Sequence, residues 1–229
     1  MFKKILIANR GEIACRVAAT ARRMAIRTVA VYSDADAHAN HVRACDESVH
    51  LGGSAPKDSY LRWEKILEAA KATGAEAVHP GYGFLSERAD FAQACADAGL
   101  VFIGPTPEQL ALFGDKARAR ELATRCEVPV MPGSAGAVTL AQAQTFFAEQ
   151  QAQGAGVMVK AIGGGGGRGM RAVLEAGELA EAHARCMSEA RAAFGIEGVY
   201  VERLMRDARH IERSEERRVG KEGRSRWSP

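Results

Sequence analysis

Short apolar runs alternate with segments of helical periodicity along the first hundred residues. The short runs are rich in Val, Ile and Ala, which predicts strands, whereas a recurrence of apolar residues every three or four positions predicts amphipathic helices. The predicted strands lie at 4–8, 27–32, 75–79 and 100–103, and the predicted helices lie at 11–23, around Tyr60–Ala70 and around Phe91–Ala98. Such alternation is typical of an α/β domain whose parallel sheet is covered by helices on both faces.

A second pattern begins after the sequence Gly114-Asp115-Lys116, which we interpret as a boundary between two units. Residues 107–126 and 139–151 have helical spacing, and so does the segment that carries Leu179, His183, Met187 and Phe194. Apolar strands are predicted at 157–162 and 198–202, and another strand follows Arg168. The second unit is therefore expected to mix helices with a hairpin sheet.

The hairpin of the second unit has a connection that is almost pure glycine. Val157–Ile162 is followed by Gly163–Gly167 and then by Arg168–Val173, and Lys160 lies on the first strand. Glycine lets successive backbone N–H groups converge on an anion, because no Cβ blocks the approach and positive φ is accessible. A lysine beside such a loop adds a positive charge, so the pattern predicts a loop that grips the phosphates of a nucleotide.

The position of the lysine excludes the two commonest glycine-loop motifs. A Walker loop places Lys-Ser/Thr after its glycines and opens a helix, whereas Lys160 precedes the glycines here. A dinucleotide fingerprint needs a strand, glycines and then a helix, and the turn Asn9–Glu12 lacks those glycines, so no NAD site is expected there. The remaining alternative is a flexible linker, but linkers are usually mixed with serine and flanked by polar residues.

Composition limits the classes of protein that fit. Of 229 residues, 47% are hydrophobic, yet no apolar run is long enough for a membrane span and the first residues lack a secretory core. Five cysteines stand apart without a Cys-x-x-Cys pair, which favours reduced thiols in a cytoplasmic protein over disulfides or a zinc site. The histidines form no metal-ligand cluster, and His38 and His41 are expected to be solvated in a polar loop.

The net charge of +3 is confined to residues 213–229, which hold six Lys or Arg and three Glu. The rest of the chain is neutral, so the total charge indicates no basic face for nucleic acid. Residues 213–229 show no period and few apolar residues, and they resemble the translated read-through of a sequencing-library adapter. We predict a disordered, artefactual tail there; a genuine basic tail is the alternative, and resequencing the locus distinguishes the two.

Six motifs in order resemble those of biotin carboxylases, the ATP-grasp enzymes or enzyme domains of biotin-dependent carboxylases. They are KILIANRGEIACRV at 4–17, HPGYGFLSE at 79–87, FIGP at 102–105, GDK at 114–116, VKAIGGGGGRGM at 159–170 and VERLMRDARHIE at 201–212. The resemblance implies a Rossmann-like (pre-ATP-grasp) domain at 1–113 and a truncated ATP-grasp domain with its α+β lid subdomain at 114–212. Residues 31–53 look closest to acyl-CoA carboxylases of the methylcrotonyl-, propionyl- or acetyl-CoA type.

The resemblance also implies a reaction and a set of site residues. ATP phosphorylates bicarbonate, and the carboxyphosphate formed carboxylates biotin held on a carrier domain or subunit; Mg²⁺ or Mn²⁺ assists, and a carboxyltransferase subunit uses the product. A homodimer is expected, and no nucleic acid or membrane partner. By position in the motifs, the ATP contacts are Lys116, Lys160, Gly166, Gly167, Glu202, Arg203, Leu204, Met205 and His210. The first four would meet the phosphates, 202–205 would form the adenine hinge, and His210 would reach the ribose.

Several of these residues also have simpler interpretations. Lys116 could be a solvated lysine at a helix start, Glu202 could form a surface bridge with a neighbouring arginine, and His210 could be exposed. The motif at 79–87 is interpreted as a structural turn without a catalytic role; Arg88 stands where the family pattern continues with asparagine.

The residues that hold the metal and handle bicarbonate in this family lie beyond residue 212 of the pattern, so no catalytic or metal-binding residue is assigned. Two functions therefore stay open for the chain: a biotin carboxylase ligase, or an inactive fragment that at most binds nucleotide weakly. A third candidate is another ATP-grasp ligase, such as a carbamoyl-phosphate or purine-pathway synthetase. The motifs at 9–14 and 79–87 together argue against that third candidate.

Overall fold

The structure is a computed structural model that describes residues 1–162, 169–194, 198–206 and 208–209. The chain divides into two compact units at Val130/Met131, here called the first and second units. That division falls later than the domain boundary predicted after residue 113. No helix of the described residues is long and apolar enough to cross a membrane.

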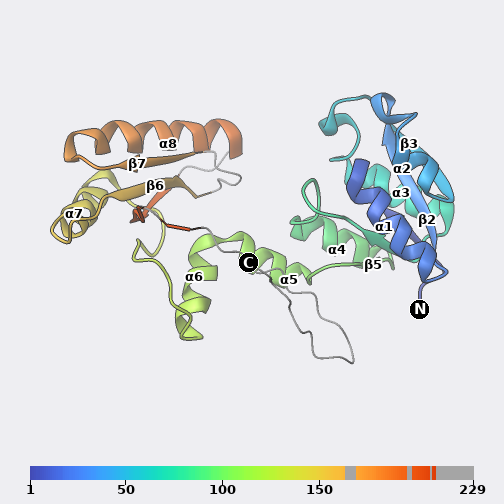
Figure 1. Ribbon diagram of the computed structural model, residues 1–229, viewed down its shortest axis with the longest axis horizontal. Coiled ribbons are helices and arrows are strands. Elements are labelled where there is room, and N and C mark those ends of the chain that lie inside the picture. Colours follow the sequence, from blue (N-terminus) through green and yellow to red (C-terminus); the bar gives the residue numbers. More distant parts are fainter. Residues whose placement is uncertain (163–168, 195–197, 207, 210–229) are drawn as a thin grey trace. The chain divides into compact units, whose positions relative to one another are not determined.

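A five-stranded parallel sheet forms the first unit, as the alternating pattern predicts (blue to green in Figure 1). Its strands are β1 (Lys4–Ile7), β2 (Arg27–Ser33), β3 (Glu47–Gly52), β4 (Ala77–His79) and β5 (Val101–Phe102), in the order β3-β2-β1-β4-β5. Its helices are α1 (Gly11–Arg23), α2 (Asn40–Ala44), α3 (Trp63–Thr73), α4 (Ala89–Asp97), α5 (Pro107–Gly114) and α6 (Lys116–Arg125), with short 3-10 turns η1 (Asp34–Asp36) and η2 (Pro56–Asp58). The strand order reverses direction between β1 and β4.

Alternate residues of each strand point to opposite faces of this sheet, and helices bury both faces. On one face, Leu6 and Val78 pack with Ile66 of α3 and Phe91 of α4. On the other face, α1 covers the strands with small side chains: Ile7 packs with Ala14 and Ala18, and Ile5 packs with Ala21. Because alanines line its buried side, α1 can approach the sheet closely. The turn between β1 and the start of α1 lines a cavity of ligand size.

The sequence patterns assign no element between residues 33 and 59, yet β3 and α2 lie there. β3 is an edge strand with alternating burial, so polar and apolar residues mix along it and no apolar run marks it. The prediction that His41 is solvated is wrong. His41 lies in α2 and is fully buried, and its Nε2 lies 3.2 Å from the carbonyl oxygen of Val31. A hydrogen bond to a backbone acceptor explains how a polar ring is tolerated in the core.

The predicted helical region 107–126 is two helices rather than one. α5 begins at a capping box, in which the Thr106 side chain accepts the Gln109 N–H and the Gln109 side chain accepts the Thr106 N–H. α5 ends at Gly114, the C-cap residue Asp115 has an extended backbone (φ −94°, ψ 108°), and α6 starts at Lys116. The Asp115 carboxylate accepts the Arg118 N–H at 3.1 Å, which satisfies one free donor of the first turn of α6.

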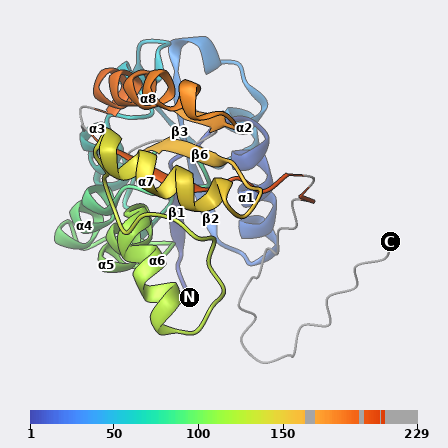
Figure 2. The same ribbon diagram turned by 90° about the vertical axis from the view of Figure 1, so that its left-hand side faces the viewer.

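The described residues of the second unit form a three-stranded antiparallel sheet with two helices. Its elements are α7 (Leu140–Gln151), β6 (Val157–Ala161), β7 (Met170–Val173), the 3-10 turn η3 (Ala176–Glu178), α8 (Leu179–Phe194) and β8 (Val199–Arg203), and the strand order is β7-β6-β8. α8 runs alongside β7 and β6 in Figure 1, and Figure 2 shows α8 above β6. This arrangement confirms the predicted hairpin and the predicted third strand.

Both helices pack on one face of the second sheet, the helix-covered face. Val157, Val159 and Val201 point to it and pack with Phe147 of α7 and Leu179 of α8. The strand register sends the intervening residues to the opposite face, here called the Lys160 face. Its members are Met158, Lys160, Met170, Ala172, Tyr200 and Glu202. The sheet thus has an aliphatic core on one side and a mixed polar and apolar surface on the other.

Candidate functional site

Lys160 and Glu202 meet on the Lys160 face. The register of β6 and β8 places Lys160 opposite Tyr200 and Met158 opposite Glu202. Lys160 and Glu202 are therefore diagonal neighbours, whose long side chains can touch across the strands. They form an ion pair in the structure, and the exposed fractions of the two side chains are 21% for lysine and 16% for glutamate.

The surroundings of this ion pair are mainly apolar and aromatic. The Lys160 Nζ atom lies 6.0 Å from the centre of the Tyr200 ring, within the range of a cation–π contact. Tyr200 is buried at 6% exposure, while Met170 on the adjacent strand is 43% exposed. An ammonium group half-covered by aromatic and aliphatic groups needs a counter-ion, and Glu202 supplies it. Among the described residues, the ion-pair partner of Glu202 is therefore Lys160 and not the neighbouring arginine of the simpler interpretation.

The chain continues past Glu202 as an ordered extended segment. Arg203 points the other way from Glu202, and its Nη1 donates to the Gln153 side-chain oxygen at 3.1 Å. The backbone N–H of Leu204 donates to the carbonyl of Gly156 at 2.9 Å, which ties the segment to the start of β6. Leu204 is half-buried and Met205 is 57% exposed. The structure thus places Glu202 beside Lys160 and directs the Arg203 side chain away from them.

Both ends of the glycine connection are fixed where the structure describes them. The Ala161 N–H donates to the carbonyl of Gly169 at 2.8 Å, directly beyond the Lys160–Met170 pair. Gly169 has φ +68°, and a Cβ there would lie 2.8 Å from the Ala161 Cβ, so only glycine fits. The predicted phosphate contacts Gly166 and Gly167, and the predicted ribose contact His210, lie outside the described residues. Lys116 opens α6, and its side chain also lies outside what the structure describes.

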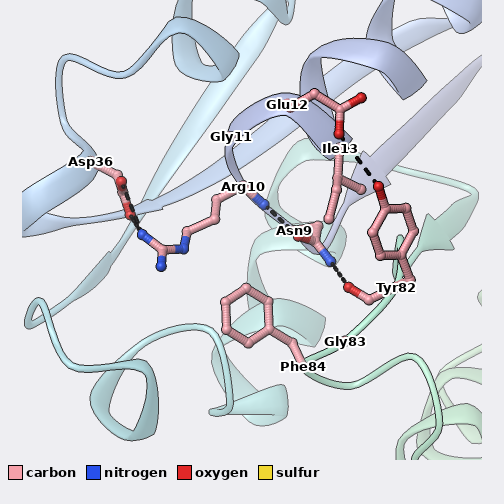
Figure 3. Close-up of a pocket in the computed structure, with 9 residues that line it drawn as sticks. All are labelled: Asn9, Arg10, Gly11, Glu12, Ile13, Asp36, Tyr82, Gly83 and Phe84. Carbon is pink, nitrogen blue, oxygen red and sulfur yellow. Dashed lines mark hydrogen bonds and ion pairs between the residues drawn. The ribbon is translucent and has the colours of Figure 1, made fainter. Parts of the chain in front are cut away.

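A second candidate site lies in the first unit, at the carboxyl ends of β1, β2 and β4 (Figure 3). It is a cavity of about 470 Å³ lined by Asn9, Arg10, Gly11, Glu12, Ile13, Asp36, Tyr82, Gly83 and Phe84. The strand order reverses between β1 and β4, and in open parallel sheets ligands bind outside the carboxyl ends at such a reversal. Sequence reasoning treated the loops after β1 and β4 as turns, assigned no role to the loop after β2, and missed this cavity.

Asn9 holds the two main walls of the cavity together. It is 1% exposed, and its Nδ2 donates to the carbonyls of Pro80 at 2.8 Å and Tyr82 at 3.0 Å, while its Oδ1 accepts the Arg10 N–H at 2.9 Å. The loop that carries Tyr82 is also fixed by His79, whose Nδ1 accepts the Gly81 N–H at 3.0 Å. Burial and the charge of Arg16 lower the pKa of His79, which keeps that nitrogen available as an acceptor.

Arg10 forms the opposite wall together with a buried polar network. Its guanidinium lies 5.7 Å from the centre of the Tyr60 ring and 5.8 Å from that of Phe84, and Nη1 lies 3.3 Å from the Asp36 carboxylate. Asp36 also accepts hydrogen bonds from the Tyr60 hydroxyl at 2.7 Å and from Ser33 at 3.0 Å.

The network shifts the acidity of both of its central groups. Burial alone favours a raised pKa for Asp36, but the hydrogen bonds from Tyr60 and Ser33 and the charge of Arg10 together lower it below the usual value. Burial and the bond to Asp36 raise the pKa of Tyr60 to about 12, so the phenol stays protonated as a donor.

Neither candidate site offers an evident metal centre. No group of three or more His, Cys, Asp or Glu side chains that could hold a metal ion occurs within the part of the chain that the structure describes. The chemistry that the described residues can supply is electrostatic and hydrogen-bonding: a paired ammonium on the Lys160 face and a cavity with aromatic walls in the first unit.

Two family models match consecutive parts of the chain. Residues 1–110 match the biotin carboxylase N-terminal domain, and residues 115–215 match the ATP-binding domain of the carbamoyl-phosphate synthase L chain. The first match covers the parallel sheet with its cavity, and the second covers the sheet that carries Lys160 and Glu202.

Curated relatives and solved structures agree with these matches. The chain is 48% identical to the biotin carboxylase of Nostoc sp. over 92% of its length, which is 47% of the relative, and 48% identical to the pyruvate carboxylase of Bacillus subtilis over 92% of its length, which is 18% of the relative. A crystal structure of a biotin carboxylase–β-γ-ATP complex from Campylobacter jejuni has a TM-score of 0.86 at 41% identity, covering 90% of this chain and 46% of that one.

The similarity extends to a biotin carboxylase domain of 2-oxoglutarate carboxylase from Hydrogenobacter thermophilus, with a TM-score of 0.82 at 43% identity over 88% of this chain and 44% of that one. The chain spans less than half the length of the curated relatives it resembles. It belongs to the biotin carboxylase family, of which it carries the N-terminal domain followed by a stretch of the ATP-binding domain.

Proposed function

We propose that this chain contributes the nucleotide-binding part of a biotin carboxylase, a ligase that uses ATP and bicarbonate to carboxylate biotin on a carrier. The observation that carries the proposal is the pairing of Lys160 with Glu202 on the Lys160 face, in the unit that matches an ATP-binding domain. The structures of related proteins that hold MgADP with bicarbonate, or β-γ-ATP, support the same assignment.

Lys160 is proposed to bind phosphate oxygens. A unit charge about 4 Å from an ammonium is worth on the order of 4 kcal/mol at an effective dielectric of 20, and the half-buried setting of Lys160 favours that dielectric over the value for bulk water. Glu202 is proposed to accept a hydrogen bond from the amino group of the base, with the half-buried Leu204 beside it as an apolar contact. Lys116, Gly166, Gly167, Arg203, Met205 and His210 keep their proposed ATP contacts on the strength of their motifs alone.

Mg²⁺ or Mn²⁺, when bound, neutralises charge between the phosphates during phosphoryl transfer. We assign no ligand for it, since the described residues provide no cluster that fits the ion. The contribution of this chain is therefore to bind and orient the triphosphate through Lys160 and to hold the base through Glu202.

The proposed partners are a biotin carboxyl carrier domain or subunit, a carboxyltransferase and a second copy of the enzyme. Relatives named for biotin-dependent carboxylation, and a related biotin carboxylase domain described as a dimer, support them. The relatives include pyruvate, propionyl-CoA and methylcrotonoyl-CoA carboxylases at similar identity. The proposal of an acyl-CoA acceptor therefore depends only on the sequence of residues 31–53. Five free cysteines support a reducing, cytoplasmic location.

The test uses the reading frame extended past codon 212 and expressed as one protein. We expect ATP hydrolysis that depends on both bicarbonate and free biotin, and we expect Lys160→Met to lower the kcat/KM for ATP by about tenfold to a thousandfold. Lys71→Met, at an exposed lysine of α3, is the matched control and is expected to leave the rate unchanged. An ATP hydrolysis rate that does not depend on bicarbonate and biotin would refute the proposed reaction.

Two other functions are separated by the same assay. The 229-residue chain by itself is proposed to be inactive and to bind nucleotide weakly, so turnover by this chain alone would contradict that proposal. The ATP-binding match is named for carbamoyl-phosphate synthase, which keeps a second ATP-grasp ligase in view. Hydrolysis stimulated by ammonia in place of biotin would favour that ligase over biotin carboxylation.

A further inference from the structure

The ion pair on the Lys160 face occupies the two charged groups of that face, which the proposed function assigns to the phosphates and to the base of a nucleotide. Among the described residues that β6, β7 and β8 direct to this face, Lys160 and Glu202 are the only charged ones. Their exposed fractions of 21% and 16% mean that water replaces little of the interaction when the pair separates. Any ligand that takes one partner therefore has to compensate the other.

A phosphate group by itself compensates only half of the pair. When phosphate oxygens take the Lys160 ammonium, the Glu202 carboxylate loses its counter-ion and lies close to a new negative charge. A half-buried carboxylate without a donor is costly, and the repulsion between like charges adds to that cost. The pair thus opposes the binding of inorganic polyphosphate.

A base with an amino group compensates the other half. An ionised carboxylate only accepts hydrogen bonds, so an exocyclic amine such as that of a 6-aminopurine can replace the lysine as a donor to Glu202. A 6-oxopurine presents an acceptor at that position and repels the carboxylate. A ligand that carries both an amine and a polyphosphate can open the pair without leaving either charge uncompensated.

We propose that the Lys160–Glu202 ion pair couples phosphate binding to base binding, so that polyphosphate enters this site well only when an amino-bearing base occupies it too. The inference rests on the proposed function, because it assumes that the Lys160 face binds a nucleotide. Glu202 then determines specificity in two ways. It selects the base, and through the ion pair it weakens the binding of Lys160 to anions that carry no base.

The first test compares wild-type chain with Glu202→Gln by calorimetric titration of inorganic tripolyphosphate. Glutamine keeps the shape of the side chain but releases the ammonium, so the affinity for tripolyphosphate is expected to rise by about tenfold, within the usual range of coupling between sites. Glu149→Gln, at an exposed position of α7, makes the same change in net charge and is expected to leave the affinity unchanged. Equal affinities for wild type and Glu202→Gln, or no measurable binding to either protein at millimolar tripolyphosphate, would overturn the inference.

The second test needs no variant. Saturating adenosine is expected to raise the affinity of the wild-type chain for tripolyphosphate by several-fold, since separate ligands of coupled sites strengthen each other reciprocally. Inosine is expected to give no such increase, and equal effects of the two nucleosides would overturn the coupling.

The proposed function has a separate readout, the binding of ADP to the wild-type chain. If ADP fails to bind but the affinity for tripolyphosphate rises in Glu202→Gln, the proposed nucleotide site is refuted and the effect of the ion pair on anion binding is retained. If ADP binds but the affinity for tripolyphosphate changes neither in Glu202→Gln nor with adenosine, the nucleotide site is retained and the proposed coupling is refuted.

Discussion

Gly81 lies at the point where the loop after β4 crosses Asn9, and its replacement by alanine tests how tightly the cavity wall is packed. Gly81 has φ +66°, and a Cβ there would lie 2.6 Å from the Nδ2 of Asn9 and 2.8 Å from the Cγ2 of Ile13. Asn9 cannot move aside easily, because its amide already makes three hydrogen bonds.

Two costs add in Gly81→Ala. A left-handed backbone costs about 1–2 kcal/mol for a residue with a Cβ, and forced packing against fixed neighbours costs about 1–3 kcal/mol. We therefore expect the free energy of unfolding to fall by about 2–5 kcal/mol. Gly74→Ala is the matched control, since Gly74 has φ +67° but nothing within 4 Å of its Cβ position, so it incurs only the backbone cost.

Amide hydrogen exchange by mass spectrometry suits a chain of two units, because it reports the stability of β1 and β4 separately from that of the second unit. Peptides from β1 and β4 are expected to exchange faster in Gly81→Ala than in Gly74→Ala, with the second unit unchanged. Equal losses of protection in the two variants would refute the close packing of Gly81 against Asn9.

Three further predictions concern stability. Because the pKa of Asp36 is lowered in the fold, its ionised form stabilises the fold above the ordinary aspartate pKa of about 3.9, and this contribution is lost as the pH falls through the lower folded value. The unfolding free energy of Asp36→Asn should therefore fall less than that of wild type between neutral pH and pH values below about 3.9. Unfolding free energies from urea titrations that fall equally with pH in the two proteins would contradict this. Thr106→Ala removes the capping box of α5 and should cost about 0.5–2 kcal/mol, whereas Thr106→Ser should restore most of it. Phe147→Ala empties the core of the second unit, where Phe147 is 2% exposed, and should cost about 3–5 kcal/mol by hydrogen exchange of α7 and β6, with protection in the first unit unchanged.

The sequence predicts most of the first unit because its core elements are periodic. The apolar run at 4–8 and the helical spacing that follows reproduce β1 and α1 closely, and the run at 27–32 reproduces β2. β3 was not predictable in this way, since an edge strand exposed on one side reads as a mixture of polar and apolar residues. The burial of His41 depends on the carbonyl of Val31, a contact that only the packing of α2 on β2 creates.

The candidate sites, like the fold, could be predicted from the sequence only in part. Lys160 could be singled out from its position before the glycines, but its partner could not, because the register of two strands far apart in sequence decides which carboxylate it meets. The cavity in the first unit depends on the strand order, in which β1 and β4 become neighbours although β2 and β3 lie between them in the chain. Periodicity does not encode that order, so the loops of the cavity could be seen only as turns.

Titration of the isotope-labelled chain with ADP, followed by NMR, tests the central claim most directly. If a nucleotide binds to the Lys160 face, the signals of Met158, Lys160, Met170 and Glu202 should shift in a saturable manner, and Lys160→Met should abolish the shifts while Lys71→Met leaves them intact. Saturable shifts that bypass these four residues, or that persist unchanged in Lys160→Met, would contradict the account.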